Sequence, residues 1–298
     1  MSRPRMNARC FLPRTLVASL MCTCLFVLQS TPATVAAQSP AAQAPAKRSQ
    51  TNQQRQSGDI TDANDQKAKN SKRATKQQPK ANAKPKRKNP AMVPPKHNPD
   101  LPNVLLIGDS ISIGYTVAVR KRLEGVANVY RPLTNCGPTT RGIEQIDQWL
   151  GDRRWDIIHF NFGLHDLKYM GPNGENLADP KDPGSGQQVP IDAYAKNLRK
   201  LVLRMQKTRA KLIWRQTTPV PQGAKGRIVG DSKRYNDAAA KVMESIGGIA
   251  LDPMFEYASV APIVAAQQKA NVHYTPDGSK MLAERVAQSI RAQLRSIK

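Results

Sequence analysis

A serine in a short polar turn is the first residue of this chain whose setting suggests chemistry. Ser110 follows Gly108 and Asp109, which interrupt the apolar run at residues 104–107. Such a run is typical of a strand buried on both faces of a parallel sheet. A turn from such a strand into a helix lies at the carboxyl edge of the sheet, where open α/β sheets bind ligands. The sequence therefore predicts Ser110 at a binding edge, beside the N–H groups of a helix N-terminus.

Three histidines from residue 101 onward are candidates to activate this serine. A serine hydroxyl is a weak nucleophile and needs a base within hydrogen-bond distance. His159 falls in the middle of an expected strand, where a packed core histidine is the simpler interpretation. His273 lies in an irregular segment directly before the expected last helix, and a loop there can bring a base to the edge of the sheet. His273 is therefore the predicted base.

Two further loops are expected at the same edge. His165 directly follows the expected strand at residues 155–160, and Gly137 follows the expected strand at residues 128–131. Loops that follow parallel strands converge at one edge. An oxyanion site beside a nucleophile requires convergence of this kind. A metal site formed by His165 and Asp166 is a weaker interpretation, because adjacent residues rarely point to one ion and no metal-ligand spacing is present.

The elements that must position these residues alternate between strand and helix from residue 101 onward. The apolar patterns predict strands at residues 104–107, 128–131, 155–160, 211–215 and 248–251. They predict helices at residues 115–124, 142–150, 191–206, 235–245 and 276–294, with a long loop at residues 163–189. Alternation of this kind predicts an α/β domain at residues 101–298, with a parallel sheet covered by helices on both faces.

The first 37 residues have the pattern of a secretory signal. A basic N-terminal region is followed by the apolar stretch at residues 16–28, which is short for a membrane span. The small residues at 35–37 fit cleavage before Gln38, and an uncleaved anchor is the alternative. Only Cys136 of the four cysteines would then remain, so no disulfide is expected within a mature monomer. The pattern predicts an exported protein that is periplasmic, attached to the cell surface or secreted.

Residues 38–100 are expected to form a disordered basic linker. They are rich in Gln, Lys, Ala, Asn and Pro, and have almost no large apolar residue to bury. The chain as a whole has a formal charge of +24. The basic linker could contact an anionic cell-surface polymer, or it could serve only as a solvated spacer. Export argues against nucleic acid as the partner.

Four short blocks, in order, resemble those of the SGNH, or GDSL-type, hydrolases. They are Gly-Asp-Ser at residues 108–110, Asn-Cys-Gly at 135–137, Gly-Leu-His-Asp at 163–166, and His273 with its following residues. The resemblance extends over residues 103–290. It implies a three-layer flavodoxin-like fold and an esterase or acylhydrolase that needs no metal or other cofactor. It also implies that Ser110 is the nucleophile, His273 the base and Gly137 an oxyanion donor, together with the N–H of Ser110.

The chain departs from this family pattern at the third block. His165 stands where the family has asparagine. A neutral imidazole N–H can also donate to an oxyanion, so His165 is assigned to the oxyanion hole by the resemblance. The alternative is a structural histidine whose hydrogen bonds are satisfied within the fold.

A second departure concerns the third member of the catalytic triad. The family has aspartate three residues before the histidine, and that position here is Ala270. Asn271 could orient His273 through its carbonyl oxygen, although an amide cannot stabilise the imidazolium as a carboxylate does. Asp252 and Asp277 are the alternative partners from elsewhere in the chain.

These observations predict an exported serine esterase that works through an acyl-enzyme. The long loop has few apolar residues, so a polar acylated substrate such as an acetylated polysaccharide is expected. One alternative is a hydrolase of lipid or short-chain esters. The other is a non-catalytic polysaccharide-binding protein with a degenerate hydrolase site. The protein is expected to be a monomer.

Overall fold

The computed structural model describes residues 88–297 of the chain. The predicted signal peptide and most of the predicted linker lie outside the described residues. Among the helices at residues 88–297, none is both long enough and apolar enough to cross a membrane.

Five parallel strands form the central sheet, and all five expected strands are present. Their order across the sheet is β2-β1-β3-β6-β7. Strand β1 pairs with β2 on one side and with β3 on the other, so the chain reverses its direction of winding at β1. The strands are β1 (Asn103–Ile107), β2 (Asn128–Tyr130), β3 (Ile157–Phe160), β6 (Lys211–Arg215) and β7 (Ile249–Asp252).

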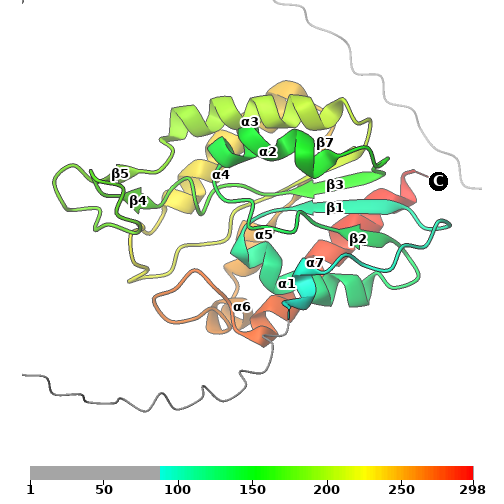
Figure 1. Cartoon of the computed structure of the whole chain (residues 1–298). Helices are drawn as coiled ribbons and strands as arrows, with labels where there is room; N and C mark the ends of the chain where they lie inside the picture. Colours follow the sequence, from blue (N-terminus) through cyan, green and yellow to red (C-terminus); the bar gives the residue numbers. More distant parts are fainter. Residues whose placement is uncertain (1–87, 298) are drawn as a thin grey trace, which may run out of the picture. The chain divides into compact units, whose positions relative to one another are not determined.

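Helices cover both faces of this sheet. Figure 1 shows α2, α3 and α4 on one face and α1 and α7 on the other. The helices of each layer also pack on one another, α2 on α3, α3 on α4, and α1 on α7. Their bounds are α1 (Ser110–Arg122), α2 (Thr139–Leu150), α3 (Ile191–Gln206), α4 (Asp231–Ile246) and α7 (Pro276–Arg295). The predicted three-layer α/β fold is confirmed.

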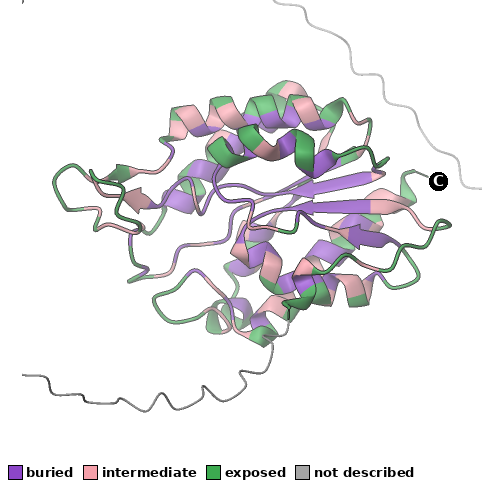
Figure 2. Ribbon diagram, viewed as in Figure 1, coloured by how far each residue is buried: buried purple, intermediate pink, exposed green. Residues whose placement is uncertain are grey.

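The core lies between the sheet and these two helical layers. The central strands are buried on both faces, and Figure 2 shows the buried side of each helix turned toward them. Val104, Leu106 and Ile158 are fully buried, as are Leu198 and Leu201 of α3 and Val286 and Ile290 of α7. Continuous apolar strands of this kind are what burial on both faces requires.

Some elements begin earlier than the apolar pattern predicts. Helix α1 starts at Ser110 rather than at residue 115, because the side chain of Asp109 caps it and accepts a hydrogen bond from the N–H of Ile111 at 3.0 Å. The expected loop at residues 163–189 contains a small antiparallel hairpin, β4 (Tyr169–Met170) with β5 (Gly186–Gln187). Two short helices after β7, α5 (Met254–Ala258) and α6 (Ala261–Ala265), were not predicted.

The boundary expected at residue 100 is wrong, because the last part of the predicted linker packs on the domain. A short helix, η1 (Pro90–Met92), buries Ala91. The guanidinium of Arg120 donates to the carbonyls of Pro90 and Val93, at 3.0 and 2.8 Å. Composition alone indicates that few apolar groups are available here, but backbone carbonyls can bind a neighbouring side chain whatever the local composition.

Candidate active site

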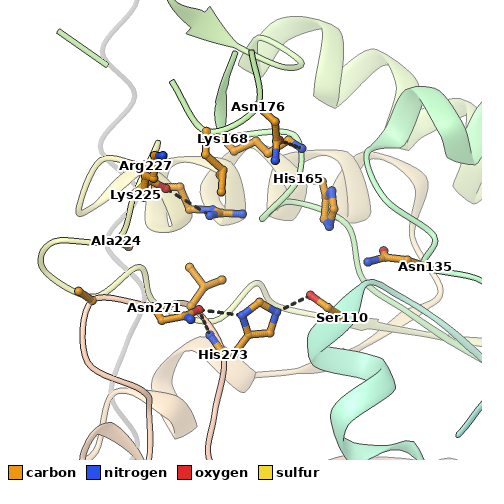
Figure 3. Close-up of a pocket in the computed structure, with 13 residues that line it drawn as sticks. Ser110, Asn135, His165, Lys168, Asn176, Ala224, Lys225, Arg227, Asn271 and His273 are labelled. Atoms are coloured by element: carbon orange, nitrogen blue, oxygen red, sulfur yellow. Dashed lines mark hydrogen bonds between the residues drawn. The ribbon is translucent and has the colours of Figure 1, made fainter. Parts of the chain in front are cut away.

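Ser110, His273 and Asn271 form a continuous hydrogen-bonded row (Figure 3). The Oγ of Ser110 lies 2.8 Å from Nε2 of His273, and Nδ1 of the same ring lies 2.7 Å from Oδ1 of Asn271. An amide oxygen can only accept, so Nδ1 must carry the proton. In the neutral ring Nε2 is then free to accept the proton of the serine hydroxyl, which is the arrangement that general-base catalysis needs.

The loop before α7 holds the amide of Asn271 in this orientation. Its Oδ1 also accepts the backbone N–H of His273 at 3.1 Å, and its Nδ2 donates to Oε1 of Gln268 at 3.3 Å. The backbone N–H of Gln268 in turn donates to the carbonyl of His273 at 2.9 Å. Ala270, which stands at the family aspartate position, has a positive φ of 52° within this turn. These contacts leave Asn271, rather than residue 270, facing the ring.

Neither alternative carboxylate reaches His273. Asp252 is fully buried, accepts from His159 Nε2 at 3.0 Å and forms an ion pair with Arg285 at 3.0 Å. Burial acts to raise the pKa of Asp252, but its hydrogen bond to His159 and the nearby cations outweigh it and the pKa is lowered. Asp277 pairs with Lys280 on the surface of α7. His159 is thus the packed core histidine that its position in the strand predicts.

The turn that presents Ser110 is anchored by a buried arginine that the sequence interpretation missed. Arg131 lies directly after β2, and its Nη2 donates to the carbonyls of Gly108 and Thr134, each at 3.2 Å. It therefore joins the loop after β1 to the loop after β2. Arg131 is only 5% exposed. In the sequence it is a charged residue at the end of an expected strand, where an arginine is usually exposed, so the sequence pattern gave no sign that it is buried. Ser110 itself is the first residue of α1, and its backbone N–H has no acceptor within the helix.

The backbone N–H of Gly137, predicted as an oxyanion donor, has a partner in this structure. It donates to Oδ1 of Asn135 at 3.0 Å, so this N–H is already engaged and does not point freely at the pocket. Asn135 lines the pocket instead, together with His165 and Ser110. Figure 3 shows the amide of Asn135 between Ser110 and His165. The short polar turn at residues 135–137 favours this contact, because an asparagine side chain readily accepts a backbone N–H two residues later.

His165 faces the pocket from the loop after β3. Burial, more than any neighbouring charge, lowers the pKa of this ring, so it is held in its neutral form. Gly163 sets the path of this loop, because a Cβ at that position would overlap the hydroxyl of Thr217. Asp166 points away from the pocket, and its Oδ1 accepts from the backbone and the hydroxyl of Thr139, at 2.8 and 2.5 Å.

The pocket over Ser110 is cationic. It has a volume of about 450 Å³, and Lys168, Lys225 and Arg227 line it alongside the serine and the histidines. Within residues 88–297, no group of three or more His, Cys, Asp or Glu side chains is placed to hold a metal ion. The site thus combines a serine–histidine pair, convergent donors and a positively charged wall, an arrangement that can bind and cleave an ester.

Solved structures share this fold at low sequence identity. An acetyl xylan esterase, AlAXEase, is 12% identical with a TM-score of 0.50, over 63% of this chain and 99% of that chain. A lipase/acylhydrolase from Enterococcus faecalis is 14% identical with a TM-score of 0.49, over 64% and 96%. Axe2, an acetylxylan esterase from Geobacillus stearothermophilus, is 17% identical with a TM-score of 0.49, over 63% and 94%. Among curated proteins, none matches this chain.

The family comparison covers most of the domain. A family model described as GDSL-like Lipase/Acylhydrolase matches residues 104–286, which include all four blocks of the site. This match spans more than half of the chain, from the start of β1 into α7. The chain therefore belongs to the GDSL-like lipase/acylhydrolase family and is a hydrolase of ester bonds.

Proposed function

We propose that this protein cleaves an acyl ester by a serine mechanism. The observation that carries the proposal is the row from Ser110 Oγ through His273 to Asn271, with heavy-atom distances of 2.8 and 2.7 Å. Oγ attacks the ester carbonyl carbon while Nε2 of His273 takes the hydroxyl proton. The tetrahedral intermediate collapses, and His273 returns that proton to the departing alcohol. Water then attacks the acyl-serine by the same route, which releases the acid and restores Ser110.

Three donors are proposed to stabilise the oxyanion. The first is the backbone N–H of Ser110, at the N-terminus of α1. The second is the neutral ring of His165, and the third is the side-chain amide of Asn135, whose oxygen is already bound to the N–H of Gly137. With its oxygen engaged in this way, the amide has its N–H groups available to the pocket.

The substrate is proposed to be polar, with an acetyl or another small acyl group. The apolar contribution to the pocket comes from Leu177, Ala224, Ala270 and Val272, which are too few to enclose a long acyl chain. An acylated carbohydrate fits the cationic, open site better than a lipid ester does. An acetylated glycan is also the substrate named for the acetyl xylan esterase AlAXEase, whose likeness to this chain is one of fold.

Labelling with a fluorophosphonate probe tests the proposal directly. We expect the probe to modify Ser110, and Ser110→Ala to abolish both labelling and turnover of 4-nitrophenyl acetate. Ser296→Ala, at the exposed end of α7, is the matched control and should behave as wild type. A folded wild-type protein that neither labels nor hydrolyses small esters would instead support the non-catalytic binding protein.

Export and the role of the basic segment are further parts of this proposal. The signal-like residues 1–37 support a mature protein that begins at Gln38 and lies outside the cytoplasm. The basic residues that follow would hold it near an anionic cell-surface polymer. The N-terminal sequence of the protein recovered from the exported fraction tests the first statement. Salt-dependent retention of that protein on cell envelopes tests the second. We also propose that this protein is a monomer.

A further inference from the structure

The cations beside Ser110 have no carboxylate partner. Lys168, Lys225 and Arg227 all line the pocket, and no acidic residue lines it within the described part of the chain. None of the three forms an ion pair with a carboxylate of residues 88–297, whereas several surface lysines and arginines of this domain do. The pocket therefore contains positive charge that the protein itself leaves uncompensated.

Lys168 is the clearest example of a pocket cation without a carboxylate partner. It is 9% exposed, and its ammonium donates to the neutral amide oxygen of Asn176 at 2.6 Å. Burial, and then the neighbouring Arg227, lower the pKa of Lys168. Burying an ammonium group without an opposite charge costs free energy. The position of Lys168 therefore lowers the stability of the folded protein.

Arg227 is held in place by backbone contacts that leave part of its guanidinium free. Its Nε donates to the carbonyl of Leu164 at 3.2 Å. Its Nη2 has no hydrogen-bond partner within residues 88–297. Asp109 is the carboxylate whose field acts on Arg227, but it forms no ion pair with the guanidinium and caps α1 through the N–H of Ile111. Figure 3 shows Lys168 and Arg227 across the pocket from His273 and Ser110.

We propose that the ester substrate carries an anionic group near its scissile bond, and that Lys168 and Arg227 bind this group while the ester reaches Ser110. The proposal rests on the serine-esterase function and adds the class of its substrate, an acylated acidic compound such as a uronate-containing glycan. A guanidinium held by its Nε and a buried ammonium are suited to a carboxylate, which accepts charge-assisted hydrogen bonds from both. Lys225 is exposed and adds attraction at longer range.

A pair of small esters that differ in one charge tests this. We compare 4-acetoxybenzoate with its uncharged methyl ester, and add 4-acetoxybenzenesulfonate to distinguish a carboxylate site from a general anion site. Probes with a single charge are used because the basic N-terminal region of the full chain attracts polyanions without any specific site. We expect wild-type kcat/KM to favour the benzoate over its methyl ester by about tenfold.

The ratio of the two rates is the readout, because loss of folding or of Ser110 chemistry lowers both. Arg227→Gln and Lys168→Gln should bring the ratio close to one. Lys241→Gln removes the same charge from an exposed position on α4 and should leave the ratio unchanged. An unchanged ratio in both pocket variants, or a wild-type ratio near one, would overturn the anion site while leaving the esterase function intact.

Binding without turnover separates the two proposals. Ligand-observed NMR with Ser110→Ala protein measures how the benzoate and its methyl ester bind. Tighter binding of the benzoate that disappears on adding Arg227→Gln supports the anion site even if no ester is hydrolysed. Equal binding of both esters contradicts it, whatever the catalytic result.

Discussion

The hydrogen-bond partner of His273 Nδ1 is the amide oxygen of Asn271 rather than a carboxylate. In a serine triad, replacing the aspartate by asparagine can reduce kcat by about four orders of magnitude, chiefly because it selects the wrong imidazole tautomer. Here the amide of Asn271 is fixed with its oxygen toward Nδ1 by two further hydrogen bonds, so the correct tautomer is retained. What the site lacks is only the negative charge that would stabilise the imidazolium.

We therefore expect Asn271→Asp to increase activity. A carboxylate at this position favours the protonated ring, so the acid limb of the pH–rate profile should move to higher pH while kcat at alkaline pH rises several-fold. Asn271→Ala should lower kcat by about 100-fold or more, because nothing then orients the ring. Initial rates on 4-nitrophenyl acetate between about pH 5 and pH 9 provide the measurement. Superimposable profiles for wild type and Asn271→Asp would show that residue 271 does not act on His273.

The two pocket histidines should respond differently to the same substitution. His165→Asn introduces the residue that the family uses at this block, and an amide N–H can donate to an oxyanion, so appreciable activity should remain. His273→Asn should be inactive, because an amide cannot accept the serine proton. Both variants are assayed on one acetyl ester. The opposite result, with an active His273→Asn and an inactive His165→Asn, would show that the base and the oxyanion donor are exchanged.

Assigning the oxyanion donor to Asn135 or to Gly137 predicts opposite results for a single variant. If the amide of Asn135 donates to the oxyanion, Asn135→Ala should lower kcat by about 100-fold with little change in KM. If Gly137 is the donor, the same variant releases its N–H and activity should be kept or increased. Asn173→Ala, in the exposed part of the long loop, is the control. The ratio of kcat values decides between the two donors.

At the scale of elements, one buried carboxyl joins the start of α2 to the loop that carries His165. Both contacts of Asp166 to Thr139 use Oδ1, and its Oδ2 has no hydrogen-bond partner. Burial raises the pKa of Asp166 to about 7, against the opposing effect of the Thr139 hydrogen bonds. Since the folded-state pKa exceeds the unfolded value of about 4, the stability due to this group is complete below about pH 4. That contribution decreases as pH rises through about 7.

Asp166→Asn should remove this pH dependence. Asparagine can keep both Thr139 contacts through its Oδ1 and cannot ionise. Relative to the variant, wild type should therefore lose several degrees in melting temperature between about pH 4.5 and pH 8. Thermal unfolding of both proteins across this range, followed by circular dichroism, measures the difference. Parallel curves would mean that Asp166 is ionised in the native state throughout the range.

At the scale of the whole molecule, the folded unit extends into the segment that composition assigns to the linker. Residues 89–98 contact the domain through Arg120 and through Asn128, whose Nδ2 donates to the carbonyl of Asn98 at 2.7 Å. A protein that begins at Pro99 loses these contacts, and Nη1 of Arg120 then has no carbonyl acceptor, while its Nε keeps the carbonyl of Val129. We expect its melting temperature to be lower by several degrees than that of a protein that begins at Lys88.

This comparison also tests the remaining part of the linker. The protein that begins at Lys88 should have the same melting temperature as the mature protein, because residues 38–87 have too few apolar groups to pack into the core. Equal melting temperatures for all three proteins, at one salt concentration, would show that the contacts of residues 89–98 contribute no stability.

The sequence by itself determined the architecture and the meeting of Ser110 and His273 at one edge of the sheet. Continuous apolar strands alternating with amphipathic helices admit few arrangements other than a parallel sheet between two helical layers, and α3 and β6 begin and end where their patterns do. Ser110 and His273 were identified because each follows or precedes an element whose end must lie at the carboxyl edge. Their placement depends on topology, which periodicity encodes.

Only the tertiary structure decided which polar groups meet at that edge. Three examples are the hydrogen bonds of Asn271, Asn135 and Arg131. They depend on the conformation of the loops and on which carbonyls remain unpaired. Such contacts produce no periodic pattern in a sequence. The cationic wall is a further case, because Lys168 and Arg227 are 59 residues apart and come together only when the long loop folds against the segment after β6. Their separation in the sequence does not show that they lie close together. That their charges have no carboxylate partner can be established only from the groups that surround them in the structure.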